Sequence, residues 1–327
     1  MTSLRTILAT AFGAACALVA GAGIAQTKWD MPLPYPDSNF HTKNTRQFAD
    51  EIGKASGAKL AITVHSNGAL IKHPEIKRAV QTGQVPMGEF LVSILSNEAA
   101  VFAFESNPFL ANSYEKQRRL WTAAKPVLEK RLDSQGIMLL YSVPWPPSAI
   151  HTKKDLNSVA DLKGLKLRSY SAVTSRFAEL AGAIPVLVPA PEVAQAFRTG
   201  MIDAQINSSA GGVDTQTWDS TTHFYNVRVI LPQNMVIVNK AAFAKLEPAT
   251  QKAIRDAAAA AETRGWTQSV TEDDQNIKTL ASKGIKILEP SAKLAAELQE
   301  VGKKMAAEWS AKAGAEGEAI LKAYQGN

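Results

Sequence analysis

The chain almost lacks cysteine: its 327 residues include one, Cys16. Cys16 falls in an N-terminal segment in which Arg5 precedes an apolar stretch, residues 7–22, that is followed by the small residues Gly23 and Ala25. This is the order of a secretory signal peptide, so we expect cleavage after Ala25. The stretch is shorter than the ~20 residues of a membrane-spanning helix, which disfavours an uncleaved anchor. The exported chain would then contain no cysteine, which excludes disulfides, cysteine nucleophiles and thiolate metal sites.

A strong excess of one charge sign is also lacking. The 36 Lys and Arg against 30 Asp and Glu give a formal net charge of +6, and loss of Arg5 with the signal peptide leaves +5. Basic and acidic residues are interleaved rather than clustered. The sequence therefore predicts no nucleic-acid-binding surface, and it slightly favours an anionic small molecule as partner.

Signatures of catalysis are absent from the sequence. Its five histidines show no metal-ligand spacing, and it contains no G-x-S-x-G nucleophile motif, phosphate-binding glycine loop or dinucleotide-binding motif. We therefore expect no cofactor, no metal and no enzymatic activity. The enzymatic alternative is a periplasmic lyase or isomerase of small acids that uses Glu89 with an arginine clamp.

Short β-rich segments alternate with helical ones, which is typical of α/β lobes with mainly parallel strands. About 300 exported residues exceed what one hydrophobic core usually serves, so we expect two lobes. Pro144-Trp145-Pro146-Pro147 can continue neither a helix nor a central strand, and it predicts the first crossing between lobes. The predicted division is 26–145 with 234–273 for the first lobe and 146–233 with 274–327 for the second.

The individual elements follow from the hydrophobic pattern. The predicted strands are 28–33, 59–65, 137–143, 165–169, 184–188, 202–207, 234–239 and 285–288. The predicted helices are 40–55, one that begins near residue 74, 114–133, 172–180, 192–199 and 248–283, with two more after residue 288. We expect Gly265 to break the long helix and the glycine-rich residues 208–212 to form a turn.

Residues 74–85 and 191–202 resemble one another: both begin Pro-Glu, contain an apolar helical face, and have a glycine two residues before a final β-branched residue. Generic requirements of a helix-to-strand unit can produce such a likeness. Alternatively, the two lobes are structural equivalents that face one another across a cleft.

The segment D-L-K-G-L-K-L-R at 161–168 alternates leucines with basic residues, so Arg168 points away from the leucines or off the strand end. A guanidinium suits a carboxylate because its planar fork makes two parallel charge-assisted hydrogen bonds. From the residues alone, an arginine on a strand is more often solvated or paired with a neighbouring acid than bound to a ligand.

Three further features accompany this segment: P-E-V-x-x-A-F at 191–197, G-x-I-D-A-Q-I-N at 200–207, and the long helix before strand 285–288. Together they make the whole exported chain resemble the extracytoplasmic solute-binding proteins of tripartite ATP-independent periplasmic (TRAP) transporters, of the C4-dicarboxylate-binding type. The resemblance implies an α/β, two-lobed periplasmic binding protein fold with a central cleft, hinge strands and a long lobe-spanning helix.

The same resemblance implies a function. It is that of a periplasmic subunit that captures a small organic carboxylate by lobe closure and delivers it to the membrane subunits of a permease driven by an ion gradient. The alternative is a ligand-binding input for a periplasmic sensor.

The resemblance also implies that Arg168 holds the ligand carboxylate and that Asn207 assists. Ser148 stands near the place where some members carry a second arginine. We therefore favour a 2-oxo, 2-hydroxy or aromatic monocarboxylate over a dicarboxylate.

Other candidates could contact the ligand or serve only in packing. Tyr170 and Ser208 could donate hydroxyl hydrogen bonds, Trp145 could stack on the ligand, and Trp218 could close over it. From the first lobe we expect Tyr35, Asn39, Glu89 and Phe90 near the cleft, although Glu89 would repel a carboxylate unless its own charge is satisfied.

Overall fold

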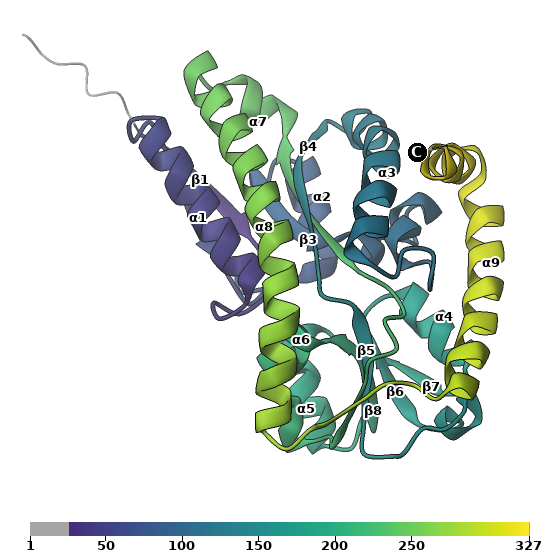
Figure 1. Ribbon diagram of the computed structural model, residues 1–327. Helices are drawn as coiled ribbons and strands as arrows, with labels where there is room; N and C mark the ends of the chain where they lie inside the picture. Colours follow the sequence, from purple (N-terminus) through teal and green to yellow (C-terminus); the bar gives the residue numbers. More distant parts are fainter. Residues whose placement is uncertain (1–25, 327) are drawn as a thin grey trace, which may run out of the picture.

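The computed structural model describes residues 26–326, so the predicted signal peptide, with Cys16, lies outside the described residues. The described chain forms two lobes, one above the other in Figure 1. Strands of the first lobe are β1 (Thr27–Pro32), β2 (Leu60–His65), β3 (Met87–Leu91), β4 (Ile137–Pro144) and β10 (Gln233–Asn239). Strands of the second are β5 (Ser148–Thr152), β6 (Lys166–Ser169), β7 (Ile184–Leu187), β8 (Ala204–Ser208), β9 (His223–Tyr225) and β11 (Lys286–Leu288).

Parallel and antiparallel strand pairs are equally frequent, so the expectation of mainly parallel strands is wrong. β1 and β2 pair in parallel, whereas β10 runs antiparallel to both β3 and β4. The six-stranded sheet of the second lobe has the order β11-β9-β5-β8-β6-β7, and β5 is antiparallel to both of its neighbours. All four antiparallel pairs of the described chain involve β5 or β10. Each of these two strands directly follows a crossing between the lobes, so no local sequence pattern indicates the direction in which it runs.

Helices α1 (Phe40–Ala55), α3 (Tyr114–Asp133) and α4 (Ala172–Leu180) begin and end at the predicted residues. The side chains of Asn39, Ser113 and Ser171 cap them by accepting a backbone N–H of the first turn, a donor that has no partner within the helix. The other helices are α2 (Ile76–Gln81), α5 (Val193–Arg198), α6 (Ser209–Asp214), α7 (Lys240–Ala244), α8 (Pro248–Ser282) and α9 (Ala292–Gln325).

Two chain segments cross between the lobes side by side. The proline-rich segment 144–147 joins β4 to β5, at the position where the sequence predicts a crossing, and residues 226–232 return the chain to β10. The backbone N–H of Trp145 donates to the carbonyl of Pro232 at 2.7 Å, and that of Ser148 donates to Ile230 at 2.8 Å. These hydrogen bonds tie the two crossings into one hinge.

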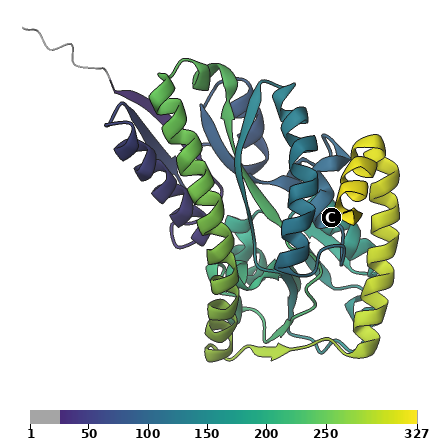
Figure 2. The same ribbon diagram turned by 45° about the horizontal axis from the view of Figure 1, so that its top comes forward.

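Helix α8 runs unbroken past Gly265, so the expected interruption there is wrong. A Cβ at Gly265 would lie 2.4 Å from a methyl carbon of Val143 and 2.9 Å from the side-chain nitrogen of Asn44. α8 packs so closely against β4 and α1 that only glycine fits at this position. The same packing keeps the backbone of Gly265 helical. Figure 2 shows α8 in green and α9 in yellow on opposite sides of the molecule, each reaching from one lobe to the other.

Helix α9 consists of two helical segments joined at Gly314, as the two predicted C-terminal helices require. Leu294 and Leu298 pack in the core of the second lobe, whereas Trp309 and Ile320 pack in that of the first. Residues 274–327 therefore do not lie wholly in the second lobe as the sequence suggested.

Residues 209–214 form helix α6 instead of the predicted glycine-rich turn. Ser208 caps this helix, because its Oγ accepts the backbone N–H of Gly211 at 3.1 Å, and the helix packs against α8. Tertiary contacts therefore outweigh the low helix propensity of its glycines.

The two similar sequence segments adopt the same local structure. A short 3₁₀ turn, His73–Glu75 or Ala190–Glu192, leads into α2 or α5, and each helix is followed by a glycine with positive φ, Gly83 or Gly200. His73 and Ala190 thus hold equivalent positions in the two lobes. Within the described residues, none of the helices combines the length and the apolar character needed to span a membrane.

Candidate functional site

A cavity of about 410 Å³ lies between the lobes, a volume suited to a small ligand. β6 and β8 are parallel neighbours, so their carboxyl ends lie at the same end of the six-stranded sheet and present Arg168 and Asn207 there. The second lobe also contributes Ser148, Tyr170, Ser208 and Asp214. The first lobe and the crossing contribute Tyr35, His73, Leu91 and Trp145.

Arg168 is 3 % exposed, and no carboxylate of the described residues pairs with it. Its Nε donates to the carbonyl oxygen of Val188 at 3.0 Å, and Nη1 donates to that of Ile206 at 3.4 Å. Burial lowers the pKa of Arg168 to about 10, so the guanidinium remains charged at neutral pH. A buried cation without an anion is costly, and this wall of the cavity therefore favours an anionic ligand.

The amide of Asn207 is oriented by a relay of hydrogen bonds. Nε2 of Gln205 donates to the hydroxyl of Thr217 at 3.0 Å, which leaves its Oε1 to accept from Nδ2 of Asn207 at 3.1 Å. Oδ1 of Asn207 accepts the backbone N–H of Ser208 at 3.0 Å. One N–H of the Asn207 amide is left over beside Arg168 as a donor for a ligand oxygen.

Two hydroxyl groups lie next to the arginine. The guanidinium carbon of Arg168 is 5.2 Å from the centroid of the Tyr170 ring, and the Tyr170 hydroxyl lies 3.4 Å from that of Ser148. Ser148 is almost fully buried. The position near which some members of the family carry a second arginine therefore holds a hydroxyl group, and Arg168 is the one arginine among the described residues that line the cavity.

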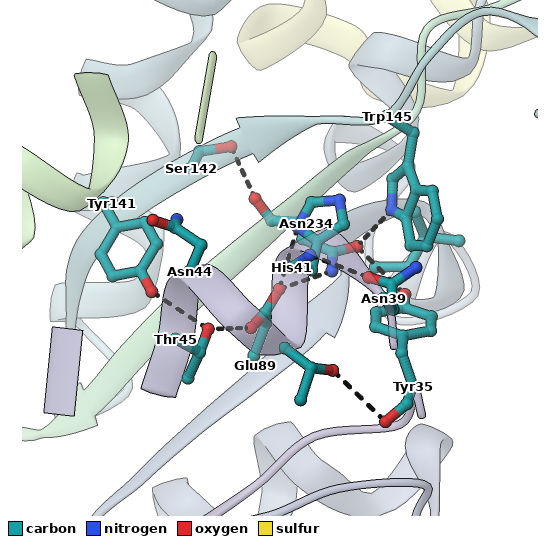
Figure 3. A network of polar contacts seen from close by, with 12 residues as sticks. Tyr35, Asn39, His41, Asn44, Thr45, Glu89, Tyr141, Ser142, Trp145 and Asn234 are labelled. Atoms are coloured by element: carbon teal, nitrogen blue, oxygen red, sulfur yellow. Dashed lines mark hydrogen bonds and ion pairs between the residues drawn. The ribbon is translucent and has the colours of Figure 1, made fainter. Parts of the chain in front are cut away.

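The opposite wall is aromatic. Tyr35 and Trp145 meet edge to face with ring centroids 4.8 Å apart. Both donate to the same acceptor, Oδ1 of Asn234: the Tyr35 hydroxyl at 3.1 Å and the indole nitrogen at 2.9 Å (Figure 3). Asn234 therefore fixes the orientation of both rings.

Glu89 in turn fixes the orientation of Asn234 (Figure 3). One Glu89 oxygen accepts from Nδ2 of Asn234 at 2.7 Å and lies 3.2 Å from Nδ1 of His41, and the other accepts from the Thr45 hydroxyl at 2.6 Å. Burial alone raises the pKa of Glu89, but hydrogen bonds from these three donors outweigh it and lower that pKa. Burial lowers the pKa of His41, and the contact of its Nδ1 with the Glu89 carboxylate shows that Nδ1 carries a proton. The Glu89 carboxylate lies behind the aromatic wall with its charge satisfied.

A hydrogen bond joins the two lobes at the side of the cavity. Nδ2 of Asn39, the residue that caps α1, donates to Oδ2 of Asp214 at 2.6 Å. Burial raises the pKa of Asp214 to about 6. Asn39 thus connects the lobes but does not itself line the cavity. Nowhere in residues 26–326 do three His, Cys, Asp or Glu side chains gather in a way that could hold a metal ion.

The family model of the bacterial extracellular solute-binding proteins, family 7 (DctP), matches residues 34–312. The chain belongs to this family. A solved structure of DctP6, a Bordetella pertussis extracytoplasmic solute receptor that binds pyroglutamic acid, is 48 % identical, with a TM-score of 0.91 over 92 % of this chain and all of that one.

Two further relatives agree with this assignment. A marine-metagenome TRAP solute-binding protein specific for pyroglutamate is 39 % identical, with a TM-score of 0.90 over 92 % of this chain and 99 % of that one. A solute-binding protein of Albidiferax ferrireducens is 25 % identical over 278 residues, which cover 83 % of this chain and 81 % of that protein. The resemblance to TRAP solute-binding proteins and the two-lobed α/β fold are both confirmed, and the family is extracytoplasmic and made of receptors rather than enzymes.

Two residues expected at the ligand site of this solute-binding protein lie elsewhere. Phe90 is fully buried in the first-lobe core, because side chains alternate along β3 and its neighbour Glu89 takes the face toward α1. Trp218 packs against the cluster of Phe224 and Leu280, with the Lys283 ammonium 5.5 Å from its ring. Glu89 is near the site but behind its wall.

Sequence reasoning missed three residues that shape the site: His73, Asn234 and Asp214. His73 and Asp214 line the cavity, and Asn234 holds its aromatic wall. The likeness of the segments at 74–85 and 191–202 was a signal for His73. His73 directly precedes the first segment and Ala190 directly precedes the second, so the two residues hold equivalent positions in the two lobes. No sequence pattern marked Asn234, because its partners are distant in the chain.

Proposed function

We propose that this solute-binding protein captures a small monocarboxylate, with pyroglutamate as the first candidate, and delivers it to a TRAP permease. The observation that carries the proposal is the buried, unpaired guanidinium of Arg168 at the cavity wall. A ligand carboxylate would neutralise this charge with charge-assisted hydrogen bonds and would accept a further one from Asn207.

The distribution of charge in the cavity supports a ligand with one carboxylate. Arg168 is the cation of the lining, and Asp214 adds a carboxyl group on the same lobe. A second ligand carboxylate would meet Asp214 and an aromatic wall rather than another cation. Apolar groups of Trp145, Leu91 and the prolines of the lining instead suit a compact, largely apolar ring or chain.

The two relatives that bind pyroglutamate support the choice of that ligand, because they match the chain over more than nine-tenths of its length. Pyroglutamate is a compact monocarboxylate with a ring amide, which fits both features of the cavity. The 2-oxo, 2-hydroxy and aromatic monocarboxylates favoured on sequence grounds are the comparison ligands.

Delivery would follow from closure of the lobes about the hinge. The ligand carboxylate binds to the second lobe, and the aromatic wall then covers the ligand and excludes water from its ion pair with Arg168. The permease would recognise the closed form.

Thermal unfolding and calorimetric titration of the exported chain test the proposal. L-Pyroglutamate should raise the unfolding temperature more than pyruvate, lactate, benzoate or succinate does, because a ligand stabilises the state it binds. Arg168→Ala should abolish the effect, whereas Arg198→Ala, at an exposed arginine on α5, should preserve it. Binding of pyroglutamate by Arg168→Ala with unchanged affinity would contradict the assignment, and a wild-type chain that binds none of these acids would contradict the proposed function.

A further inference from the structure

The structure determines the tautomer of His73. Its Nε2 lies 3.0 Å from the backbone nitrogen of Leu91, whose N–H can only donate. Nε2 must therefore be an unprotonated acceptor, and in the neutral imidazole the proton is on Nδ1. Burial, together with the positive charge of Arg168, lowers the pKa of His73 to about 4 against the opposing effect of Glu89, so the ring is neutral at physiological pH.

The Nδ1–H of His73 has no acceptor among residues 26–326. The ring lines the cavity, and its nearest aromatic neighbour is Tyr35, whose ring centroid lies 5.9 Å away in an edge-to-face arrangement. Nδ1 makes no hydrogen bond with these residues, yet it is not one of their fully buried unpaired atoms. It is therefore open to the cavity. The hydrogen is therefore accessible to a molecule in the cavity.

The other donors of the aromatic wall are already used. The hydrogens of the Tyr35 hydroxyl and the Trp145 indole both point to Asn234. Asn67 and Asn97 also line the cavity, but both are exposed residues at its edge. The second lobe carries Ala190 at the position equivalent to His73, so only one of the two matching positions offers a hydrogen-bond donor.

We propose that His73 determines ligand specificity by donating its Nδ1–H to an acceptor oxygen of the ligand at the end remote from the carboxylate. This inference rests on the proposed function, in which Arg168 and Asn207 hold the carboxylate from the opposite lobe. The protein then selects carboxylates that carry a carbonyl oxygen across the ring or chain, such as the lactam oxygen of pyroglutamate, over analogues with a methylene there. Such an analogue would cover the Nδ1–H without offering it an acceptor, and this loss penalises its binding.

Two ligands that differ only in the carbonyl group isolate this contact: 3-oxocyclopentane-1-carboxylate and cyclopentanecarboxylate. Two variants separate the functions of the histidine. His73→Gln retains an acceptor for the Leu91 N–H but has no donor at the Nδ1 position. His73→Asn places an amide at the Nδ1 position but does not reach Leu91.

Calorimetric titration should show that the wild-type protein binds the oxo acid about ten-fold more tightly than cyclopentanecarboxylate. His73→Gln should bind both equally, with the affinity for cyclopentanecarboxylate unchanged. His73→Asn should keep most of the preference, although it unfolds at a lower temperature because Leu91 loses its acceptor. In NMR spectra, the Nδ1 proton of His73 should shift downfield with the oxo acid and not with cyclopentanecarboxylate.

A His73→Gln variant that loses the same factor for both ligands, or that keeps the wild-type preference, overturns the specificity proposal while the proposed function stands. Failure of the wild-type chain to bind either cyclic acid or pyroglutamate overturns both.

Discussion

Asn39 and Asp214 connect the two lobes directly, with 2.6 Å between the amide nitrogen of one and a carboxylate oxygen of the other. Asn39 caps α1 in the first lobe, and Asp214 ends α6 in the second. Because the two elements belong to different lobes, this hydrogen bond forms only when the lobes are together. It therefore stabilises the form of the protein that encloses a ligand.

Replacement of Asn39 tests this connection. Asn39→Ser keeps a side-chain oxygen that can cap α1 but is too short to reach Asp214, so the unliganded fold should keep its unfolding temperature within a few degrees. Ligand affinity should fall by about ten-fold or more, because a hydrogen bond to a charged group contributes about 1.5 kcal/mol or more. Titration calorimetry measures the affinity, and small-angle scattering should show a larger radius of gyration at subsaturating ligand. Unchanged affinity in Asn39→Ser would show that the contact contributes nothing to closure.

Ligand affinity should depend on the titration of Asp214. Burial raises its pKa to about 6, the negative charge of Glu272 adds to this effect, and Asn39 and Lys43 oppose it. A bound carboxylate adds another negative charge nearby and raises this pKa further, so binding takes up protons. Affinity should therefore increase as the pH falls from 7.5 to 5, by up to about ten-fold for each unit of additional shift.

Asp214→Asn should show no such pH dependence, since Arg168 stays protonated throughout and the neutral side-chain oxygen of the variant can still accept from Asn39. Asp219→Asn, at an exposed aspartate of the same lobe, is the control and should retain it. An Asp214→Asn variant with the wild-type pH profile would locate the titrating group elsewhere.

The elements with strong local signals could be predicted from the sequence, and those that depend on distant contacts could not. The amphipathic pattern and capping residues of α1, α3 and α4 predicted their bounds, whereas β5 and β9 are short strands that pair with each other although they are distant in the sequence. The same division holds in the site. Arg168 and Asn207 lie on recognisable segments, but Asn234 gains its function from Glu89, Tyr35 and Trp145, which are remote from it in sequence.

Glu89→Gln tests how far the aromatic wall depends on the buried carboxylate. An amide nitrogen at the oxygen that faces Asn234 and His41 would meet two donors. If it faced Thr45 instead, the Thr45 hydroxyl would have to accept and turn its hydrogen to Tyr141, whose own hydroxyl hydrogen would then lack an acceptor. We expect a loss of about 2 kcal/mol in unfolding free energy, from one unsatisfied buried donor, together with weaker ligand binding. Chemical denaturation and calorimetric titration measure the two effects.

The matched control for Glu89 is Thr45→Val, which removes one donor on the side away from the cavity. It should lower stability by about 1 kcal/mol and leave ligand affinity unchanged. Equal losses of affinity in Glu89→Gln and Thr45→Val would mean that the network supports the fold but does not orient the wall.

The position of the Asn207 amide should depend on a glycine in the next helix. A Cβ at Gly211 would lie 2.0 Å from Oδ1 of Asn207 and 2.7 Å from its Nδ2, so alanine cannot be accommodated unless that side chain moves. Gly211 has an ordinary helical φ, and alanine favours a helix, so α6 should persist in Gly211→Ala. Ligand affinity should nevertheless fall at least ten-fold, because Asn207 loses its orientation by Gln205 and its place beside Arg168. The effect should be absent in an Asn207→Ala background, where the added methyl group meets no amide, and equal losses of affinity in both backgrounds would show that Gly211 acts through the backbone of α6 instead.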